Sequence, residues 1–440
     1  MALPDGTSIP ARTASEALWA RGRRLIPDAT QTLSKSPQQF VLGVHPIYLE
    51  RGAGSHVWDV DGNEYIDYSQ SLGPIILGHN FQPVSEAVIA QLAQGITFTL
   101  PHPLEVEVAD LITEVVPAAE MVRYAKNGSD ATSAAVRLAR AVTGREHIVF
   151  CGYHGWEDWY VAVTSRNVGV PRALGDLIHS FQYNNLDSLE ALFATHPEQI
   201  AAVIMEPVLF EAPAAGFLEG VRDLAHQHGA LLVFDEVITG FRFALGGAQE
   251  RYGVIPDLCC LGKAIANGLP LSVLAGRRDY MEAFSRLGVF ISMTFGGETL
   301  SLAAARATIG CLRSLPVYEH IWRLGARLQD GFNALATRHK LPVELVGLPP
   351  KLLLQCNDER GQRLREPYYL VLQELVKRGV LTNSTFMVSW CHSEADVDQT
   401  LGAAGEALET LASAWREDTV AARIQGRIPS GMSIVQEVRR

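Results

Sequence analysis

Short apolar segments alternate with longer amphipathic segments between about Phe81 and Gly310. The apolar segments MVRYA, HIVFC, AAVIM, LLVFD and DLCCL each end in a polar or glycine-rich turn. Buried strands that alternate with helices are typical of a mostly parallel sheet wrapped by helices, so the pattern predicts an α/β fold. In such sheets ligands bind beyond the carboxyl ends of the strands. The residues that follow these segments are therefore the first candidates for a functional site.

The chain on either side of this alternation has a different pattern. Between Leu49 and Tyr68, β-branched and aromatic residues alternate with polar ones around Asp61-Gly62-Asn63, which predicts a small antiparallel sheet with a hairpin. After Cys311, two long amphipathic stretches flank the extended segment LPVELVGLPPKLLLQC, which predicts a smaller α+β domain.

The length of the chain also favours more than one domain. A chain of 440 residues exceeds the size at which a single hydrophobic core stops growing. We expect an N-terminal segment with the small sheet at 1–72, a large domain at 73–310 and a C-terminal α+β domain at 311–440.

Composition excludes several classes of partner. The formal net charge is −11 and no dense Lys/Arg block is present, so we expect no nucleic-acid partner. The first 30 residues lack the apolar core of a signal peptide, and no apolar run is long enough to span a bilayer, so we expect a cytoplasmic protein without a membrane partner. The six cysteines show neither CxxC pairs nor metal-ligand spacing. We interpret them as buried thiols and expect no metal site.

The turn that follows MVRYA has the residues of an anion-binding loop. Gly128 allows a close backbone approach, and Ser129 and Asp130 open a helical pattern whose free N–H groups and positive dipole end face outward. The loop is either a phosphate-binding site or a Ser/Asp helix cap without a ligand. It contains neither a GxGxxG nor a GxxxxGK[ST] pattern, which disfavours a nucleotide-binding fold.

Two further strand ends carry charged residues. Asp235 ends the apolar segment LLVFD, and a carboxylate there needs a partner, either a structural arginine, a helix N-terminus or a cation such as a protonated pyridine nitrogen. Lys263 follows DLCCL and Gly262. A desolvated lysine has a lowered pKa and can attack a carbonyl, whereas a lysine with a buried stem and an exposed ammonium is the structural alternative.

The strand-end motifs occur in the order seen in class III pyridoxal-phosphate aminotransferases, which this chain resembles from about Leu25 to Cys391. The matching motifs are Asn127 to Ala131, Tyr153-His154-Gly155, Glu206-Pro207, Asp235-Glu236-Val237 and Gly262-Lys263. The sequence is most similar to the glutamate-1-semialdehyde aminomutase-like branch. The resemblance implies a fold type I PLP-dependent transferase with pyridoxal 5'-phosphate (PLP) as its cofactor.

The resemblance also implies how the chain holds this cofactor. Gly128 and Ser129 hold the phosphate, Tyr153 lies against one face of the pyridine ring, and Val237 packs on the other. Glu206 belongs to the supporting polar shell. Tyr153 and Val237 are core residues in the structural alternative.

For the reaction itself the resemblance implies two catalytic residues. Asp235 pairs with the ring nitrogen and keeps the ring an electron sink, while Lys263 forms the Schiff base. Thr294, in MTFGGETLS, matches a threonine that reaches the phosphate of the neighbouring subunit, so the resemblance implies a homodimer with shared active sites. The alternative for Thr294 is a turn residue.

The sequence departs from the aminomutases where they bind substrate. Residues 25–50 contain no arginine to bind a carboxylate, Met387 replaces a glutamate, and Leu72 replaces a tryptophan. The segment carries polar residues suited to hydroxyls and amines instead, namely Gln31, Thr32, Ser34 and Lys35. TLSKSP and GGETLS resemble a sub-branch that acts on sugars and aminocyclitols, including aminoglycoside antibiotic biosynthesis.

We therefore expect an aminotransferase with small-molecule substrates, an amino acid donor and an oxo-sugar or oxo-aminoglycoside acceptor. Two enzymatic alternatives use the same residues: an epimerase or racemase of an amino sugar, and glutamate-1-semialdehyde 2,1-aminomutase. A non-catalytic PLP-binding subunit is the alternative outside enzymes. The presence of both Asp235 and Lys263 argues against that last alternative.

Overall fold

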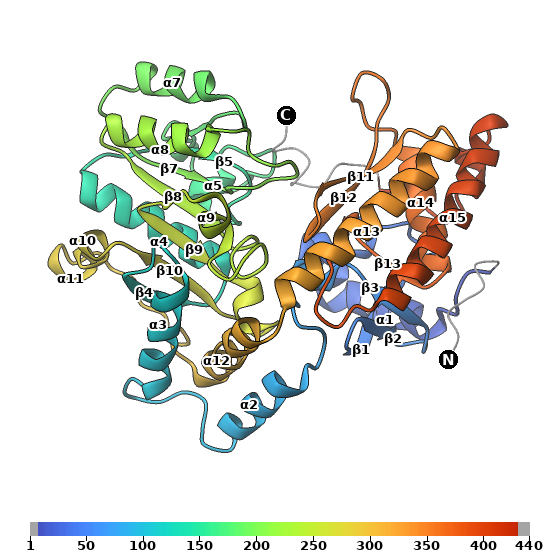
Figure 1. Ribbon diagram of the computed structural model, residues 1–440, viewed down its shortest axis with the longest axis horizontal. Helices are drawn as coiled ribbons and strands as arrows, with labels where there is room; N and C mark the ends of the chain where they lie inside the picture. Colours follow the sequence, from blue (N-terminus) through green and yellow to red (C-terminus); the bar gives the residue numbers. More distant parts are fainter. Residues whose placement is uncertain (1–7, 430–440) are drawn as a thin grey trace. The chain divides into compact units, whose positions relative to one another are not determined.

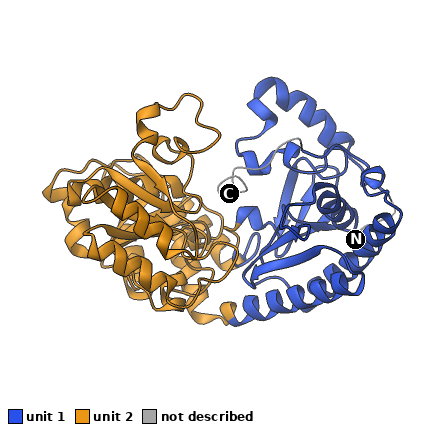
Figure 2. Ribbon diagram, turned by 90° about the horizontal axis from the view of Figure 1, so that it is seen from above, with its two compact units in different colours: residues 1–72, 76–81, 319–433 blue, residues 73–75, 82–318, 434–440 orange. Residues whose placement is uncertain are grey.

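The computed structural model describes residues 8–429, and the chain forms two compact units. Unit 1 contains residues 8–72, 76–81 and 319–429, and unit 2 contains residues 73–75 and 82–318 (Figure 2). The N-terminal segment thus belongs to the same unit as the C-terminal part of the chain. The three-part division into 1–72, 73–310 and 311–440 stays a prediction, and its two ends lie outside the described residues.

A seven-stranded sheet forms the centre of unit 2, with the strand order β4-β10-β9-β8-β7-β5-β6 (Figure 1). Its strands are β4 Met121–Ala125, β5 His147–Cys151, β6 Ile178–Ser180, β7 Ile200–Met205, β8 Leu231–Glu236, β9 Leu258–Leu261 and β10 Ser272–Gly276. All neighbouring pairs from β9 to β6 are parallel, and β10 is antiparallel to both β9 and β4. The predicted α/β fold with a mostly parallel sheet is confirmed.

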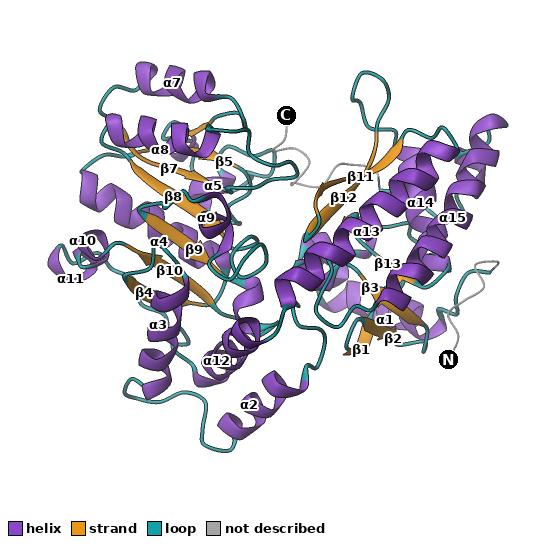
Figure 3. Cartoon of the chain, viewed as in Figure 1, coloured by secondary structure: helices purple, strands orange, loops and turns teal. Residues whose placement is uncertain are grey.

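Helices fill the connections between these strands (Figure 3). Unit 2 contains α2 Gln82–Leu92, α3 Pro103–Val115, α4 Gly128–Thr143, α5 Asp158–Val161, α6 Arg172–Gly175, α7 Leu186–Thr195, α8 Phe217–Gln227, α9 Gly247–Tyr252, η5 Lys263–Ala266, α10 Arg278–Met281, α11 Ala283–Arg286 and α12 Thr299–Ser314. Every residue of β7 and β8 is buried, as expected for central strands covered on both faces. The apolar face of α4 shares their core through Ala135 and Leu138.

Unit 1 contains two smaller sheets, β1-β2-β3-β13 and β11-β12-β14. Its elements are α1 Thr13–Leu25, η1 Pro27–Ala29, η2 Leu33–Lys35, η3 Pro37–Gln39, β1 Leu49–Ala53, β2 His56–Asp59, β3 Glu64–Asp67, η4 Gln70–Leu72, β11 Val343–Leu348, β12 Lys351–Cys356, α14 Arg365–Lys377, β13 Val380–Leu381, β14 Thr385–Phe386, α15 Glu394–Arg416 and η6 Ala421–Arg423. Helix α13 Val317–Arg338 belongs to this unit from Glu319 onward. The antiparallel pairing of β2 with β3 confirms the predicted hairpin.

Two general features of the chain follow from the structure. No helix within residues 8–429 is long and apolar enough to cross a membrane. All six cysteines are free thiols, of which Cys311 and Cys391 are half-buried and the others buried.

Candidate active site

The carboxyl ends of the parallel strands of unit 2 present most of the residues that the sequence singled out. Gly128 and Ser129 follow β4, Tyr153 follows β5, Glu206 follows β7, Asp235 lies near the end of β8 with Val237 just beyond it, and Lys263 follows β9. These strands run in one direction, so their carboxyl ends lie along one edge of the sheet. Contacts between these segments show which of them meet.

The loop before α4 is held by hydrogen bonds that leave the first turn of the helix facing outward. The Asp130 carboxylate accepts the backbone N–H groups of Lys126 at 3.1 Å and Asn127 at 2.7 Å. The Ser272 hydroxyl donates to the Asn127 carbonyl at 2.6 Å and so ties the loop to β10. The 16-residue helix that begins at Gly128 directs its positive dipole end toward this edge, and in its first turn the Asp130 N–H donates to the Asn127 carbonyl at 3.0 Å. This is the arrangement that binds phosphate groups.

Two glycines let neighbouring segments approach this helix closely. A Cβ atom on Gly128 would lie 2.8 Å from Val237 Cγ1, so the start of α4 contacts the segment after β8. A Cβ atom on Gly155 would lie only 2.5 Å from Ser129 Cβ, and Gly155 also has a φ of +113°. The segment after β5 therefore needs glycine at this position for both reasons.

Tyr153 is positioned by Glu206. The Tyr153 backbone N–H donates to Glu206 Oε1 at 2.9 Å, which ties the end of β5 to the end of β7. Burial, followed by the nearby Asp235 and Glu206 carboxylates, raises the pKa of the Tyr153 phenol above its usual value. The residue is 37% exposed, so its neutral ring is available to a ligand from the solvent side.

Asp235 is held by His154, a residue for which the sequence predicted no role of its own. His154 Nδ1 lies 2.8 Å from Asp235 Oδ2, and the Val237 backbone N–H donates to Oδ1 at 3.1 Å. A carboxylate accepts hydrogen bonds, so His154 donates through Nδ1–H. Asp235 is only 5% exposed, and its two oxygens have lone pairs left for a further donor. The strand end thus presents a rigid, buried acceptor.

The next residue, Glu236, stabilises a neighbouring helix. Its carboxylate is fully buried and accepts hydrogen bonds from the Thr239 hydroxyl and from the backbone N–H groups of Ala248 and Gln249. Side chains alternate between the two faces of a strand, so Glu236 supports the start of α9 while Asp235 points the other way. Burial raises the pKa of Glu236.

Lys263 begins η5 in a left-handed backbone conformation, with a φ of 43°. This conformation costs a non-glycine residue about 1–2 kcal/mol, and such strain is concentrated at functional sites. The lysine is half-buried. A Cβ atom on the preceding Gly262 would lie 3.3 Å from Val237 Cγ1, so the end of β9 contacts the same valine as α4.

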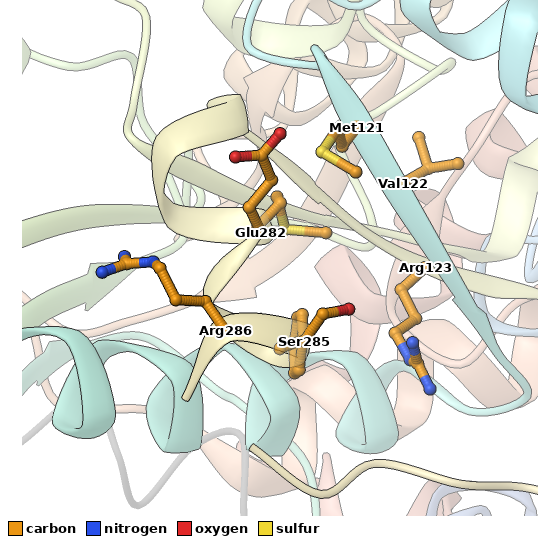
Figure 4. Close-up of a pocket in the computed structure, with 8 residues that line it drawn as sticks. Met121, Val122, Arg123, Glu282, Ser285 and Arg286 are labelled. Atoms are coloured by element: carbon orange, nitrogen blue, oxygen red, sulfur yellow. The ribbon is translucent and has the colours of Figure 1, made fainter. Parts of the chain in front are cut away.

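Thr294 is not part of this group. It is exposed in the turn 294–297, and a Cβ atom on Gly296 in that turn would lie 3.2 Å from the carbonyl oxygen of Tyr124 in β4. A pocket of about 460 Å³ lies beside the edge strand β4, and none of the candidate residues lines it. Figure 4 shows Met121, Val122 and Arg123 on one side of it and the segment of α10 and α11 on the other.

Comparisons with known proteins identify the family. The family model of class III aminotransferases matches residues 41–408. This chain belongs to the class III aminotransferases. A glutamate-1-semialdehyde 2,1-aminomutase of Roseiflexus castenholzii is 37% identical over 430 residues, which cover 92% of this chain and 99% of the relative. The predicted family is therefore confirmed.

Solved structures of other proteins support the same family and fold. The FumI protein of Sphingopyxis sp. MTA144, solved in its PLP internal aldimine form, has a TM-score of 0.86 and 30% identity, and the match covers 92% of this chain and 98% of FumI. A glutamate-1-semialdehyde aminomutase of Pseudomonas aeruginosa PAO1 has a TM-score of 0.81 and 25% identity, with 90% and 94% covered. Class III aminotransferases use PLP, and this chain is a PLP-dependent enzyme of fold type I.

The residues at the strand ends fit this cofactor. A phosphate matches the amide-rich start of α4, and a protonated ring nitrogen matches the buried Asp235 carboxylate, which has acceptor capacity left. Tyr153, an aromatic residue, and Val237, an aliphatic one, lie at the same strand ends. The individual roles of these residues remain proposals.

One prediction follows from the close contact at Gly155. Because a Cβ atom there meets Ser129, Gly155→Ala should move the segment after β5 away from α4 and weaken PLP binding about tenfold or more, measured by absorbance titration of the apoprotein. Gly144→Ala is the matched control, since Gly144 also has a positive φ, of +69°, but has open space where the Cβ would lie. Equal PLP affinities for the two variants would show that the contact with Ser129 is irrelevant to the cofactor.

Proposed function

We propose that this class III enzyme is an aminotransferase that moves an amino group from an amino acid donor to a carbonyl acceptor on a sugar or aminocyclitol. The observation that carries the transfer chemistry is the buried Asp235, held by His154 at the same strand ends as Ser129, Val237 and Lys263. A cofactor-binding subunit without catalysis has no need for a buried acceptor of this kind together with a lysine in a strained backbone conformation.

Each residue has a distinct task in this proposal. PLP, when bound, supplies an electron sink for the carbon that carries the transferred nitrogen. Lys263 Nζ would hold the cofactor and, as a free amine, would move the proton at that carbon. The Asp235 carboxylate would pair with the protonated ring nitrogen, and His154 fixes the orientation of this carboxylate. Glu206 fixes the backbone that carries Tyr153.

The proposed class of acceptor follows from the lack of an arginine that could bind a substrate carboxylate. Residues 25–50 contain no arginine, and Arg is the side chain best suited to bidentate carboxylate binding. That segment instead includes Thr32, followed by η2 with Ser34 and Lys35, which suit a polyhydroxylated substrate. Met387 is buried, and its backbone N–H donates to the Tyr68 carbonyl at 2.9 Å, so an apolar side chain stands where the resemblance implies a glutamate.

A second candidate function rests on the relatives. The Roseiflexus relative is named for the isomerisation of glutamate-1-semialdehyde and matches this chain over nearly its whole length. The aminomutase reaction would use the same strand-end residues. An epimerase or racemase of an amino sugar shares them as well.

A substrate panel separates these candidates. The purified holoenzyme is incubated with glutamate plus oxo-sugars, with glutamate plus oxo-aminoglycosides, or with glutamate-1-semialdehyde alone, and products are identified by mass spectrometry. The proposal expects an aminated sugar or aminoglycoside formed at a kcat/KM at least about 100-fold above that for glutamate-1-semialdehyde, the discrimination expected from about 2.7 kcal/mol of differential binding. A faster reaction with glutamate-1-semialdehyde would overturn the acceptor class and establish the aminomutase.

We also propose that two copies of the chain form a dimer with shared active sites. Large apolar side chains are exposed along α2, the segment 93–102 and α3, among them Ile89 at 66%, Leu100 at 77% and Val106 at 64%. The backbone N–H of Thr299 donates to the Ile96 carbonyl at 3.0 Å, so this surface adjoins the turn that carries Thr294. A second copy covering it would bury the apolar side chains and bring Thr294 to the partner's phosphate site.

Substitution of this surface tests the dimer. Leu100→Glu should convert the dimer to a monomer, measured by light scattering coupled to size-exclusion chromatography, and reduce kcat by about tenfold or more, because the shared site is incomplete. Val168→Glu is the control, since Val168 is 96% exposed in a different loop and should leave the dimer intact. Co-refolding Lys263→Ala chains with Thr294→Ala chains should restore activity above that of either alone, because one site of the mixed dimer has neither change. A wild-type monomer with full activity would refute the shared site.

A further inference from the structure

Three histidines that are far apart in the sequence lie together on unit 2, away from the candidate active site. His147 is the first residue of β5, His179 is the central residue of β6, and His196 directly follows α7. Among the residues that the structure describes, these three present ligand atoms that all lie within 4.8 Å of one another. Tyr153 follows the opposite end of β5, so the cluster is separate from the strand ends that the enzyme uses.

The local fold holds the three rings in place. In the parallel pairing of β5 with β6, His179 lies opposite Val149, which places His147 and His179 on the same face as diagonal neighbours. The backbone N–H of His147 donates to the Gln199 carbonyl at 3.1 Å, and the N–H of Gln199 donates to the His196 carbonyl at 3.2 Å. The turn after α7 is thereby tied to the start of β5, and its histidine to the other two.

The rings have the chemistry of a metal site. His147 Nδ1 lies 2.8 Å from His179 Nε2, and the centroids of the His179 and His196 rings are 4.1 Å apart. A neutral imidazole is a preferred ligand of zinc and similar divalent metals.

The spacing is close to what coordination requires. With metal–nitrogen bonds of about 2.0–2.1 Å and tetrahedral geometry, two imidazole nitrogens on one metal lie about 3.3 Å apart. The distance from His147 Nδ1 to His179 Nε2 is 2.8 Å, and the ligand atoms of all three residues lie within 4.8 Å of one another. The rings of His179 and His196 are stacked at an interplanar angle of 22°, so metal binding requires side-chain rotations that turn three nitrogens toward one ion, with a fourth position left for water.

We propose that His147, His179 and His196 form a binding site for one divalent transition-metal ion of the zinc type. The ion links β5, β6 and the turn after α7, which meet at the side of the sheet where β6 is the edge strand. Such a site stabilises the folded chain, because a metal that binds only the native arrangement adds its binding free energy to folding. Metal binding at this site requires no PLP, so a test of metal binding is independent of the proposed reaction.

Metal titration of the untagged holoenzyme, dialysed against a chelator, tests this site. Isothermal titration with Zn²⁺ should show one ion per chain in the micromolar range or tighter, and Zn²⁺ should raise the thermal midpoint while Mg²⁺ does not. Co²⁺ should produce the visible absorption bands of a four-coordinate site. His196→Asn and His179→Ala should each weaken Zn²⁺ binding at least about 100-fold, comparable to the loss expected at a metal's supporting ligands.

Controls separate this site from other zinc ligands on the chain. His339→Ala, a half-buried histidine outside the cluster, should bind Zn²⁺ as the wild type does. His196 follows a helix near the surface, so His196→Asn is the variant expected to keep the fold, which circular dichroism checks. Wild-type Zn²⁺ affinity in His196→Asn would overturn the proposal, because it would assign the bound zinc to other groups such as the free thiols. Absence of zinc binding to the wild type would overturn it as well.

Discussion

Lys263→Ala is expected to lower multiple-turnover amino transfer by about 10³-fold or more, because the variant lacks the amine that would hold the cofactor and move the proton. The loss should be in kcat, measured as 2-oxo acid released from the donor amino acid. PLP should still bind to the variant through the α4 N-terminus and Asp235, but sodium borohydride should no longer fix it to the protein.

The matched control for this variant is Lys340→Ala. Lys340 also has a left-handed backbone, with a φ of 55°, but it is exposed and lies in unit 1. Both alanine variants thus change a strained lysine, and only the one at the end of β9 should lose activity. Retention of multiple turnover by Lys263→Ala would remove this residue from the mechanism.

Asp235→Asn is expected to lower kcat by about 10²–10³-fold, because the variant loses a buried charge that, in the proposed mechanism, pairs with the ring nitrogen. The shape of the side chain is preserved, and His154 can still lie beside it. Steady-state kinetics with the donor amino acid should show the change mainly in kcat, with PLP affinity reduced less.

The adjacent carboxylate gives a control on the same strand. Glu236 accepts its hydrogen bonds from Thr239 and from the start of α9, so Glu236→Gln should lower the free energy of unfolding by about 1–3 kcal/mol and leave kcat near the wild-type value. Denaturant titration measures the first effect and the same assay the second. If Asp235→Asn kept full activity while Glu236→Gln lost it, the two assignments would have to be exchanged.

Local sequence patterns were enough to predict five strands of the central sheet, β4, β5, β7, β8 and β9, but not β6 and β10. The apolar segments before Lys126 and Gly262 became β4 and β9, and the antiparallel sheet around Gly62 formed as β2 and β3. These predictions succeed because burial on both faces requires continuous apolar strands, and a tight turn requires a few residue types. The strand-end position of the candidate residues follows from the same alternation.

Contacts between distant segments could not be predicted in this way. His154 pairs with Asp235 across 81 positions, and nothing in a Tyr-His-Gly motif indicates which side chain the histidine meets. The three-histidine cluster was missed for the same reason, since His147 and His179 are 32 positions apart and no metal-ligand spacing is visible. The register of parallel strands brings such residues together, and single-sequence patterns do not specify that register.

Transfer of isotopic nitrogen tests the central claim most directly. The holoenzyme is incubated with [α-¹⁵N]glutamate and an oxo-sugar or oxo-aminoglycoside acceptor in deuterated water, and both products are analysed by mass spectrometry. An aminotransferase at these strand ends predicts that ¹⁵N appears in the aminated acceptor together with an equal amount of 2-oxoglutarate. Deuterium exchange on a substrate without ¹⁵N transfer, or isomerisation of glutamate-1-semialdehyde without any transfer from glutamate, would contradict it.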